Sequence, residues 1–205
     1  MVIDVRGGKL IVLESNADRE NHSRLYLEML EQRARVFGPA GKNWAVTIRY
    51  GLEWDELDEE LAPVYILFVD EVGRLMGSTR MLPTTGPTLL STSFSKTFAV
   101  SASICAPSIW ECSRICLECR PGKEAAEKAA LVSRSLFVGI GHVALKAGVE
   151  SVLGIFEAPM YRLYRRIQLE VSVIEKFQTP TGMLYSGSFT VSQEILKRVS
   201  AGVMS

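Results

Sequence analysis

The order of apolar patterns along this chain is the feature that most constrains its fold. Segments that alternate apolar and polar residues, as strands do, are interleaved with segments whose apolar residues recur at helical spacing. The order is strand, helix, hairpin, strand, helix, strand, helix, hairpin, which predicts an α/β layered fold on a mixed sheet. The 205 residues contain no internal repeat and no linker, so we expect a single domain over 1–205.

Each predicted strand is a short apolar or alternating run bounded by turn residues. Four of these runs stand alone, at Lys9–Leu13, Trp44–Arg49, Ile109–Glu118 and Ser151–Phe156. Two hairpins are also predicted, which join Val64–Val69 to Leu75–Leu82 and Leu169–Phe177 to Met183–Val191.

Three segments have helical periodicity, at Asp18–Val36, Glu124–Ala147 and Met160–Ile167, and the last of them is basic. An acidic connector occupies Gly51–Leu61. The stretch Pro83–Pro107 is long and rich in Ser and Thr. Connections of that length inside a compact domain are usually functional or poorly ordered, so this stretch is a candidate functional loop.

Charge and targeting signals narrow the class of protein. Lysine plus arginine (23) balances aspartate plus glutamate (23), so no global field favours nucleic acid or an anionic membrane. The N-terminus lacks the pattern of a signal peptide. The longest charge-free stretches, Thr97–Trp110 and Phe177–Gln193, are too short or too polar to span a bilayer. We expect a cytoplasmic protein that binds neither nucleic acid nor membrane.

Four cysteines lie within fifteen positions, and the spacing of Cys112, Cys116 and Cys119 resembles the cluster-binding motif of radical S-adenosylmethionine enzymes. Side chains on a strand change face at every step. Cys112 and Cys116 are therefore expected to share a face from which Cys119 points away, so that three thiolates cannot meet at one cluster. We predict buried free thiols and no metal site.

Two further motifs are weak. The run Gly139-Ile-Gly141-His-Val-Ala144 imitates a dinucleotide fingerprint, but it lies inside a helical pattern instead of opening a helix after a strand. His22 and His142 have no Ser, Cys or second His at a recognisable catalytic or zinc-binding spacing. The sequence predicts no cofactor.

Charged side chains interrupt segments that are otherwise apolar. Arg33 lies on the apolar side of its helix, Arg80 in the middle of a strand, and Glu111 and Arg114 within another strand. Buried charge is costly unless it is paired. These groups therefore either form a structural ion network with the acidic connector or surround a charged ligand, and the two interpretations do not exclude one another.

The same residues carry a resemblance to a known family. Over about eighty positions, order, spacing and residue types resemble those of the acyl-homoserine-lactone synthases, also called autoinducer synthases, whereas the C-terminal half resembles them only in element order. The runs that carry the resemblance are Arg33-Ala-Arg-Val-Phe37, Trp44, Glu53-x-Asp55-x-x-Asp58, Gly77-Ser-Thr-Arg80-Met-Leu-Pro83-Thr84-Thr-Gly86-Pro87-Thr-Leu-Leu, Phe94 and Trp110-Glu111-Cys-Ser113-Arg114.

The resemblance implies a fold similar to the N-acetyltransferases, a three-layer α/β sandwich whose mixed central sheet opens as a V. It also implies a reaction in which an acyl chain passes from acyl carrier protein, or from coenzyme A in some members, to the amine of S-adenosylmethionine. Closure of the lactone then releases methylthioadenosine. The alternatives are a non-catalytic relative that binds S-adenosylmethionine or an acyl chain, and a coenzyme A-dependent N-acetyltransferase with another acceptor.

S-adenosylmethionine presents a carboxylate, an ammonium and a sulfonium, and the resemblance matches each to a residue type. Arg33 or Arg114 would bind the carboxylate through a guanidinium. Asp55 and Asp58 would offset the positive groups, and aromatic rings would face the sulfonium. The implied S-adenosylmethionine site consists of Arg33, Phe37, Trp44, Asp55, Asp58 and Phe94.

The implied catalytic group is Glu111, Arg80 and Arg114. Glu111 would act as the general base that deprotonates the attacking amine, directly or through water. Arg80 would hold the acidic side chains in place, and backbone N–H groups where the strands part would bind the oxyanion.

The resemblance also implies that residues in the second half of the chain bind the acyl chain and its carrier. Gly154 stands where members that make 3-oxo products tend to have Thr, which suggests an acyl chain that is unsubstituted or otherwise lacks a 3-oxo group. The segment from Arg120 to Ala125 matches a coenzyme A-binding loop poorly, which favours acyl carrier protein. The implied acyl pocket consists of Leu136, Ile140, Val152, Gly154, Ile155 and Phe156. The residues implied to dock the carrier are Lys146, Arg162, Arg165 and Arg166. Each of these four basic residues could equally belong to a solvated basic face.

Three features depart from the family pattern. The loop from Phe37 to Trp44 is one residue longer than usual, Gln168 replaces a common Gly, and the cysteine cluster is not an expected family feature.

Overall fold

The computed structural model describes residues 1–39, 44–118 and 125–204. Its central element is an eight-stranded mixed sheet in the order β1-β2-β5-β6-β7-β8-β10-β9. All neighbouring strands are antiparallel except β7 and β8. The strands are β1 (Val2–Val5), β2 (Gly8–Leu13), β5 (Val64–Asp70), β6 (Leu75–Pro83), β7 (Ile109–Leu117), β8 (Ser151–Glu157), β9 (Ser172–Thr179) and β10 (Gly182–Thr190).

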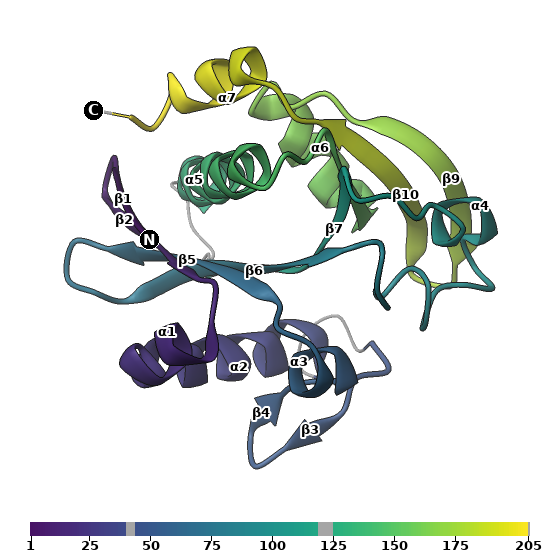
Figure 1. Ribbon diagram of the computed structural model, residues 1–205, viewed down its shortest axis with the longest axis horizontal. Helices are drawn as coiled ribbons and strands as arrows, with labels where there is room; N and C mark the ends of the chain where they lie inside the picture. The colour runs from purple at the N-terminus through teal and green to yellow at the C-terminus, as the bar shows by residue number, and fades with distance from the viewer. Residues whose placement is uncertain (40–43, 119–124, 205) are drawn as a thin grey trace.

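Helices cover both faces of this sheet, so the predicted three-layer α/β sandwich is confirmed (Figure 1). On one face lie α1 (Asn16–Asn21), α2 (Ser23–Phe37) and α3 (Glu56–Glu60), with the small pair β3 (Ile48–Arg49) and β4 (Leu52–Glu53). On the other face lie α5 (Ala125–Lys146), α6 (Ala158–Arg166) and α7 (Gln193–Ser200), and the short α4 (Ala99–Ala102) lies against β9.

The sheet opens between β7 and β8. These parallel strands pair from Ile109 with Ser151 as far as Cys112 with Gly154. Beyond that point both strands continue, to Leu117 and to Glu157, but they no longer pair with each other. The resulting divergence is the V predicted for the centre of the sheet, and it leaves a gap that side chains and ligands can enter.

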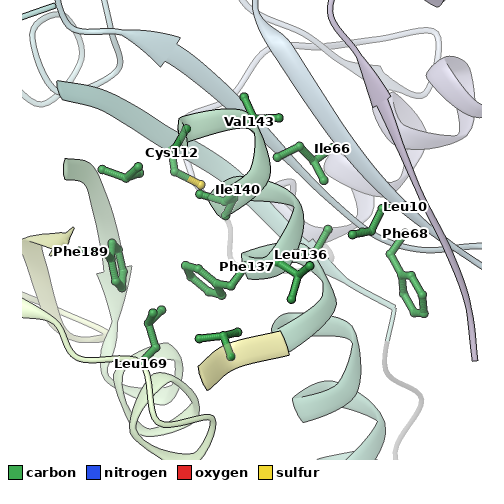
Figure 2. Packing of buried hydrophobic residues seen from close by; sticks show 14 of the residues in the cluster. Leu10, Ile66, Phe68, Cys112, Leu136, Phe137, Ile140, Val143, Leu169 and Phe189 are labelled. Atoms are coloured by element: carbon green, nitrogen blue, oxygen red, sulfur yellow. The ribbon is translucent and has the colours of Figure 1, made fainter. Parts of the chain in front are cut away.

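The larger core lies between the sheet and α5. Figure 2 shows Phe137 of α5 directed toward Phe189 of β10, while Leu136 lies on the side of Leu10 and Phe68. By length and composition α5 could cross a membrane. It is instead the core helix of this fold, because the residues from Leu136 to Ile140 are all buried by packing.

Several element predictions need correction. The helix expected over Asp18–Val36 is two helices, α1 and α2, separated at His22. The strand expected over Trp44–Arg49 is wrong, because only Ile48 and Arg49 are extended and paired. The elements β1 and α7 were not anticipated from the sequence, since both are short and only partly apolar.

The expectation that Cys112 and Cys116 share a face is also wrong. Ser78 pairs with Cys116 and Arg80 with Ser113, so two residues of β7, Arg114 and Ile115, oppose a single residue of β6. This bulge shifts the alternation by one step. Cys112 consequently packs into the core beneath α5, whereas Cys116 lies beside Ser78 on the α2 face.

Burial raises the pKa of both thiols to about 12, as suits inert core cysteines. Cys119 and the segment 120–124, on which the coenzyme A comparison rested, lie outside the described residues.

Candidate active site

Six charged side chains form a closed ion network on the α2 face of the sheet. Three arginines meet three carboxylates, so the formal charges cancel. The arginines come from a helix and two strands, and the carboxylates all come from the acidic connector between β3 and β5. The members are Arg33, Arg80, Arg114, Glu53, Asp55 and Asp58.

Arg33 of α2 is fully buried and makes the deepest contacts. Its two terminal nitrogens donate to both oxygens of Asp58, at 3.1 and 2.7 Å, and its Nε donates to Glu53. These carboxylates hold the pKa of Arg33 above its ordinary value despite burial, and the arginines hold the pKa of Asp58 well below its usual range. Both groups are therefore charged at neutral pH.

Arg80 lies in the middle of β6, and its side chain is inaccessible to solvent. It donates to both oxygens of Asp55, with the longer contact at 3.1 Å, and to Asp58 at 2.9 Å. Its Nε donates to the Ser113 hydroxyl at 3.2 Å. The predicted role of Arg80, holding the acidic side chains in place, matches this geometry.

Arg114 reaches the network because of the bulge in β7. Its backbone has φ 57°, in the left-handed region that non-glycine residues seldom adopt. Its guanidinium donates to Glu53 at 2.9 Å and to Asp55 at 3.0 Å, and lies 5.3 Å from the centre of the Phe37 ring. Strained backbone of this kind is often found at functional sites.

The connector folds so that it presents its carboxylates inward. Asp55 caps the N-terminus of α3, where Asp55 and Asp58 accept hydrogen bonds from each other's backbone N–H. The Tyr65 hydroxyl donates to Asp58 at 2.7 Å. Glu53 and Asp58 are buried, whereas the side chain of Asp55 keeps 24% of its surface exposed.

A cleft of about 510 Å³ lies where β7 and β8 part. Among the residues predicted to bind S-adenosylmethionine or to act in catalysis, Phe37, Trp44, Glu111 and Arg114 line it. The other lining residues are Leu89, Cys112, Ser113, Ile115, Ile155, Phe156, Glu157, Met160 and Tyr164.

Glu111 is almost completely buried in the wall of this cleft. One carboxylate oxygen accepts from the backbone N–H of Leu89 at 3.0 Å, and the other from that of Leu90 at 2.7 Å. Burial raises the pKa of Glu111 above its ordinary value, although these hydrogen bonds act in the opposite direction. A buried carboxylate of raised pKa is suited to accepting a proton from a bound amine.

Comparison with known proteins decides the family. Residues 16–199 match the family model described as autoinducer synthase. An acyl-homoserine-lactone synthase of Rhizobium etli is 33% identical over 90% of this chain and 85% of that protein. Another, of Rhizobium radiobacter, is 30% identical over 77% of this chain and 74% of that protein. The chain belongs to the autoinducer synthase family. It is accordingly an acyltransferase.

Solved structures agree with the fold of this autoinducer synthase. The acyl-homoserine-lactone synthase LasI has a TM-score of 0.78 at 21% identity, over 97% of this chain and 98% of that one. A coenzyme A-dependent synthase, BjaI, solved with SAM and isopentyl-CoA, has a TM-score of 0.80 at 21% identity, over 96% of this chain and 89% of that one. A protein described as an N-acetyltransferase, from Lactobacillus plantarum, has a TM-score of 0.54 at 12% identity, over 93% of this chain and 100% of that one.

The residues predicted to bind S-adenosylmethionine lie in two different places in this autoinducer synthase. Arg33 and Asp58 lie behind the cleft wall with Arg80, and all three are committed to the network. The aromatic members contact one another in a row at tilted angles, with ring centres 5.4 Å apart for Phe37 and Trp44, and 5.9 Å for Trp44 and Phe94.

The predicted acyl-pocket residues are not all in one place. Phe156 lines the cleft from the α5 face. Ile155 lines it from the opposite face, where it packs against a small hydrophobic cluster around Phe98. Ile140 and Val152 line a separate cavity between α5 and α7. Leu136 lies in the core and lines neither space, and Gly154 lies beside Cys112 in the paired part of β8.

The predicted carrier-docking residues separate as well. Arg162, Arg165 and Arg166 are exposed on α6, which begins directly after β8 at the mouth of the cleft. Lys146 lies at the other end of β8, where it pairs with Glu14 at 2.9 Å. The structure does not bring Lys146 together with the three arginines.

Sequence reasoning missed several residues of the cleft, above all Met160 and Tyr164 of α6. The basic residues of this helix drew attention to its outer face. Its amphipathic pattern could have shown that Tyr164 lies on the inner face. Within the residues described, no group of three His, Cys, Asp or Glu side chains could hold a metal ion.

Proposed function

We propose that this enzyme transfers an acyl chain from a carrier thioester to the amine of S-adenosylmethionine and then closes the product to an acyl-homoserine lactone, a quorum-sensing signal. The observation that carries the proposal is the cleft between β7 and β8, which places a buried carboxylate, Glu111, near a guanidinium, Arg114, and aromatic rings. S-adenosylmethionine needs a counterpart for each of its charged groups, and this wall supplies them.

Arg114 is the arginine that we assign to the substrate carboxylate. Both Arg33 and Arg114 were candidates, but Arg33 is fully buried behind the wall, whereas Arg114 lines the cleft. Among the described residues, the Nη1 nitrogen of Arg114 makes no hydrogen bond, so a donor remains for the substrate. Phe37 and Trp44 would face the sulfonium, and Asp55 would offset positive charge nearby.

The reaction then proceeds in two steps. Glu111 takes a proton from the ammonium, directly or through water, and the amine nitrogen forms a bond to the thioester carbonyl carbon. The oxyanion that develops is bound by backbone N–H groups of β7 beyond Cys112, where β8 no longer pairs with them. Collapse breaks the carbon–sulfur bond, and the second proton that the nitrogen loses passes to the leaving thiolate, so the carrier leaves as a free thiol.

Closure of the lactone depends on the position of the substrate carboxylate more than on acid–base catalysis. The substrate carboxylate attacks the γ-carbon, the bond from that carbon to the sulfonium breaks, and methylthioadenosine leaves as a neutral thioether. Because the leaving group is neutral, no general acid is required, and alignment of the two reacting atoms supplies most of the acceleration.

We propose acyl carrier protein as the donor. The exposed arginines of α6 at the cleft mouth suit an acidic carrier. Coenzyme A is the alternative, because BjaI was solved with isopentyl-CoA and MesI is also described as coenzyme A-dependent. From the glycine at position 154 we also propose an acyl chain without a 3-oxo group. From the substrates we propose a cytoplasmic location.

Purified enzyme tests the proposal when it is incubated with S-adenosylmethionine and either acyl carrier proteins or acyl-coenzyme A of matched chain length. Mass spectrometry should detect methylthioadenosine and a lactone, with higher kcat/KM for the carrier protein. If no donor yields methylthioadenosine, the chain is a binding regulator and the proposal fails. Acyl transfer to another amine without S-adenosylmethionine would instead identify an N-acetyltransferase.

A further inference from the structure

The lining of the cleft is polar on the α2 face of the sheet and apolar on the α5 face. Glu111, Ser113 and Arg114 line it on the α2 face, beside the ion network. Phe156 and Tyr164 line it on the α5 face, where they belong to the main hydrophobic core. If the proposed function holds, the charged substrate occupies the first side and the acyl tail extends into the second, because burying apolar tail there is favourable.

A second cavity, partly open to solvent, lies further along the same side, between α5, β10 and α7. Its lining is mainly apolar, and the proposed activity assigns it no role. Phe137 and Ile140 come from α5, Phe189 from β10, and Ile195 and Leu196 from α7. Apolar space beside an acyl site is suited to additional methylene groups of a longer chain.

Four aromatic rings separate the two spaces. Phe156 and Tyr164 line the cleft, whereas Phe137 and Phe189 line the second cavity. Tyr164 contacts all three others, with ring centres 5.2 Å from Phe189, 5.3 Å from Phe137 and 5.4 Å from Phe156. Phe137 and Phe189 are 5.4 Å apart. The four rings therefore form one continuous layer, which we term the aromatic partition.

We propose that the aromatic partition sets the acyl-chain length of this enzyme. It closes the acyl site at Phe156 and Tyr164, so the native enzyme accepts short chains and excludes longer ones from the second cavity. All four rings are buried and held by edge or tilted contacts, an arrangement that favours a closed layer. Removing one ring on the cavity side joins the two spaces without altering Glu111 or Arg114.

Phe189→Ala is the direct test, because Phe189 lines the cavity and not the cleft. Phe68→Ala is the matched control, since Phe68 is equally buried in the same core but lies on the other side of α5 (Figure 2). The assay is competition between acyl carrier proteins loaded with butanoyl to tetradecanoyl chains, read as the ratio of long to short lactones. Each added methylene that enters apolar space favours binding roughly fourfold, so Phe189→Ala should raise the ratio by about tenfold or more.

The control variant should leave the chain-length profile of the wild-type enzyme unchanged. Should Phe189→Ala fail to fold by thermal unfolding, Phe189→Leu with Phe68→Leu gives the same comparison at smaller loss of volume. A wild-type preference for the longest chains, or equal profiles for the Phe189 variants and the wild-type enzyme, would overturn the aromatic partition while leaving lactone synthesis intact. The absence of lactone from the wild-type enzyme with every donor would instead refute the proposed function.

Discussion

Loss of Arg80 should destabilise the protein severely. This side chain is inaccessible to solvent and donates four hydrogen bonds, two to Asp55, one to Asp58 and one to Ser113. Its removal leaves two arginines against three carboxylates, so one negative charge becomes uncompensated inside the protein. Breaking a buried ion pair in this way costs about 3–5 kcal/mol. That is a large fraction of the roughly 5–15 kcal/mol by which folded domains are stable.

Urea unfolding of Arg80→Ala measures this cost. Arg74→Ala is the matched control, because the side chain of Arg74 is 71% exposed and pairs with Asp70 at the surface, where we expect a loss below about 1 kcal/mol. Adding Asp58→Asn to Arg80→Ala removes one negative charge and should recover part of the lost stability. The effects of mutations at neighbouring members of a network on the free energy of unfolding are not additive. A loss below about 1 kcal/mol for Arg80→Ala would refute the account of the ion network.

Further predictions concern the catalytic carboxylate, the backbone at Gln168 and the basic face of α6. Glu111→Gln should lower kcat at least a hundredfold. It should also cost about 1–3 kcal/mol in free energy of unfolding, because its amide NH2 cannot accept from the backbone N–H that the second carboxylate oxygen binds. In the wild-type enzyme, kcat/KM should rise with pH through a pKa above that of an ordinary glutamate, because burial raises the pKa of Glu111. Gln168 has φ 60°, so Gln168→Gly should stabilise the fold by about 0.5–1 kcal/mol, seen as a higher Tm, and an unchanged or lower Tm would contradict this. Reversing Arg162, Arg165 and Arg166 to Glu should raise KM for acyl carrier protein about tenfold at low salt with kcat unchanged, whereas Lys146→Glu should not.

Acid should destabilise the native state through Asp58. The arginines hold the pKa of this carboxyl well below its unfolded value of about 3.9. A depressed folded-state pKa contributes stability that is fully present above the unfolded pKa and is lost as the pH falls below it. Urea midpoints should therefore decline below about pH 4, and Asp58→Asn should weaken that decline.

The sequence was a good guide to which residues belong together. Arg33, Arg80, Glu111 and Arg114 stood out because charge inside an apolar segment needs a partner, and the structure places three of them in one network and Glu111 in the adjoining wall. The hairpin of β5 and β6 could be predicted because a short apolar run followed by a turn at Gly73 is a local signal.

Long-range geometry could not be read from these patterns. The bulge at Arg114 depends on how β7 pairs with β6, so simple alternation assigned Cys116 to the wrong face. The members of the ion network that face the cleft are determined by the point at which β7 and β8 stop pairing. No local sequence pattern marks that point. Apart from Gly154, the acyl-pocket residues were apolar positions of the second half of the chain. Apolar character does not reveal that Ile140 packs in the core beneath α5 whereas Ile155 packs in the cluster around Phe98.

The central claim is that the cleft between β7 and β8 acylates S-adenosylmethionine with Glu111 as the base. A single-turnover experiment with S-adenosylmethionine and one acyl carrier protein, comparing the wild-type enzyme with Glu111→Gln, tests it most directly. We predict that the wild-type enzyme forms lactone, methylthioadenosine and free carrier thiol in equal amounts, and that Glu111→Gln forms none of them at a comparable rate. Equal rates for the two proteins, or thiol release without methylthioadenosine, would contradict the account.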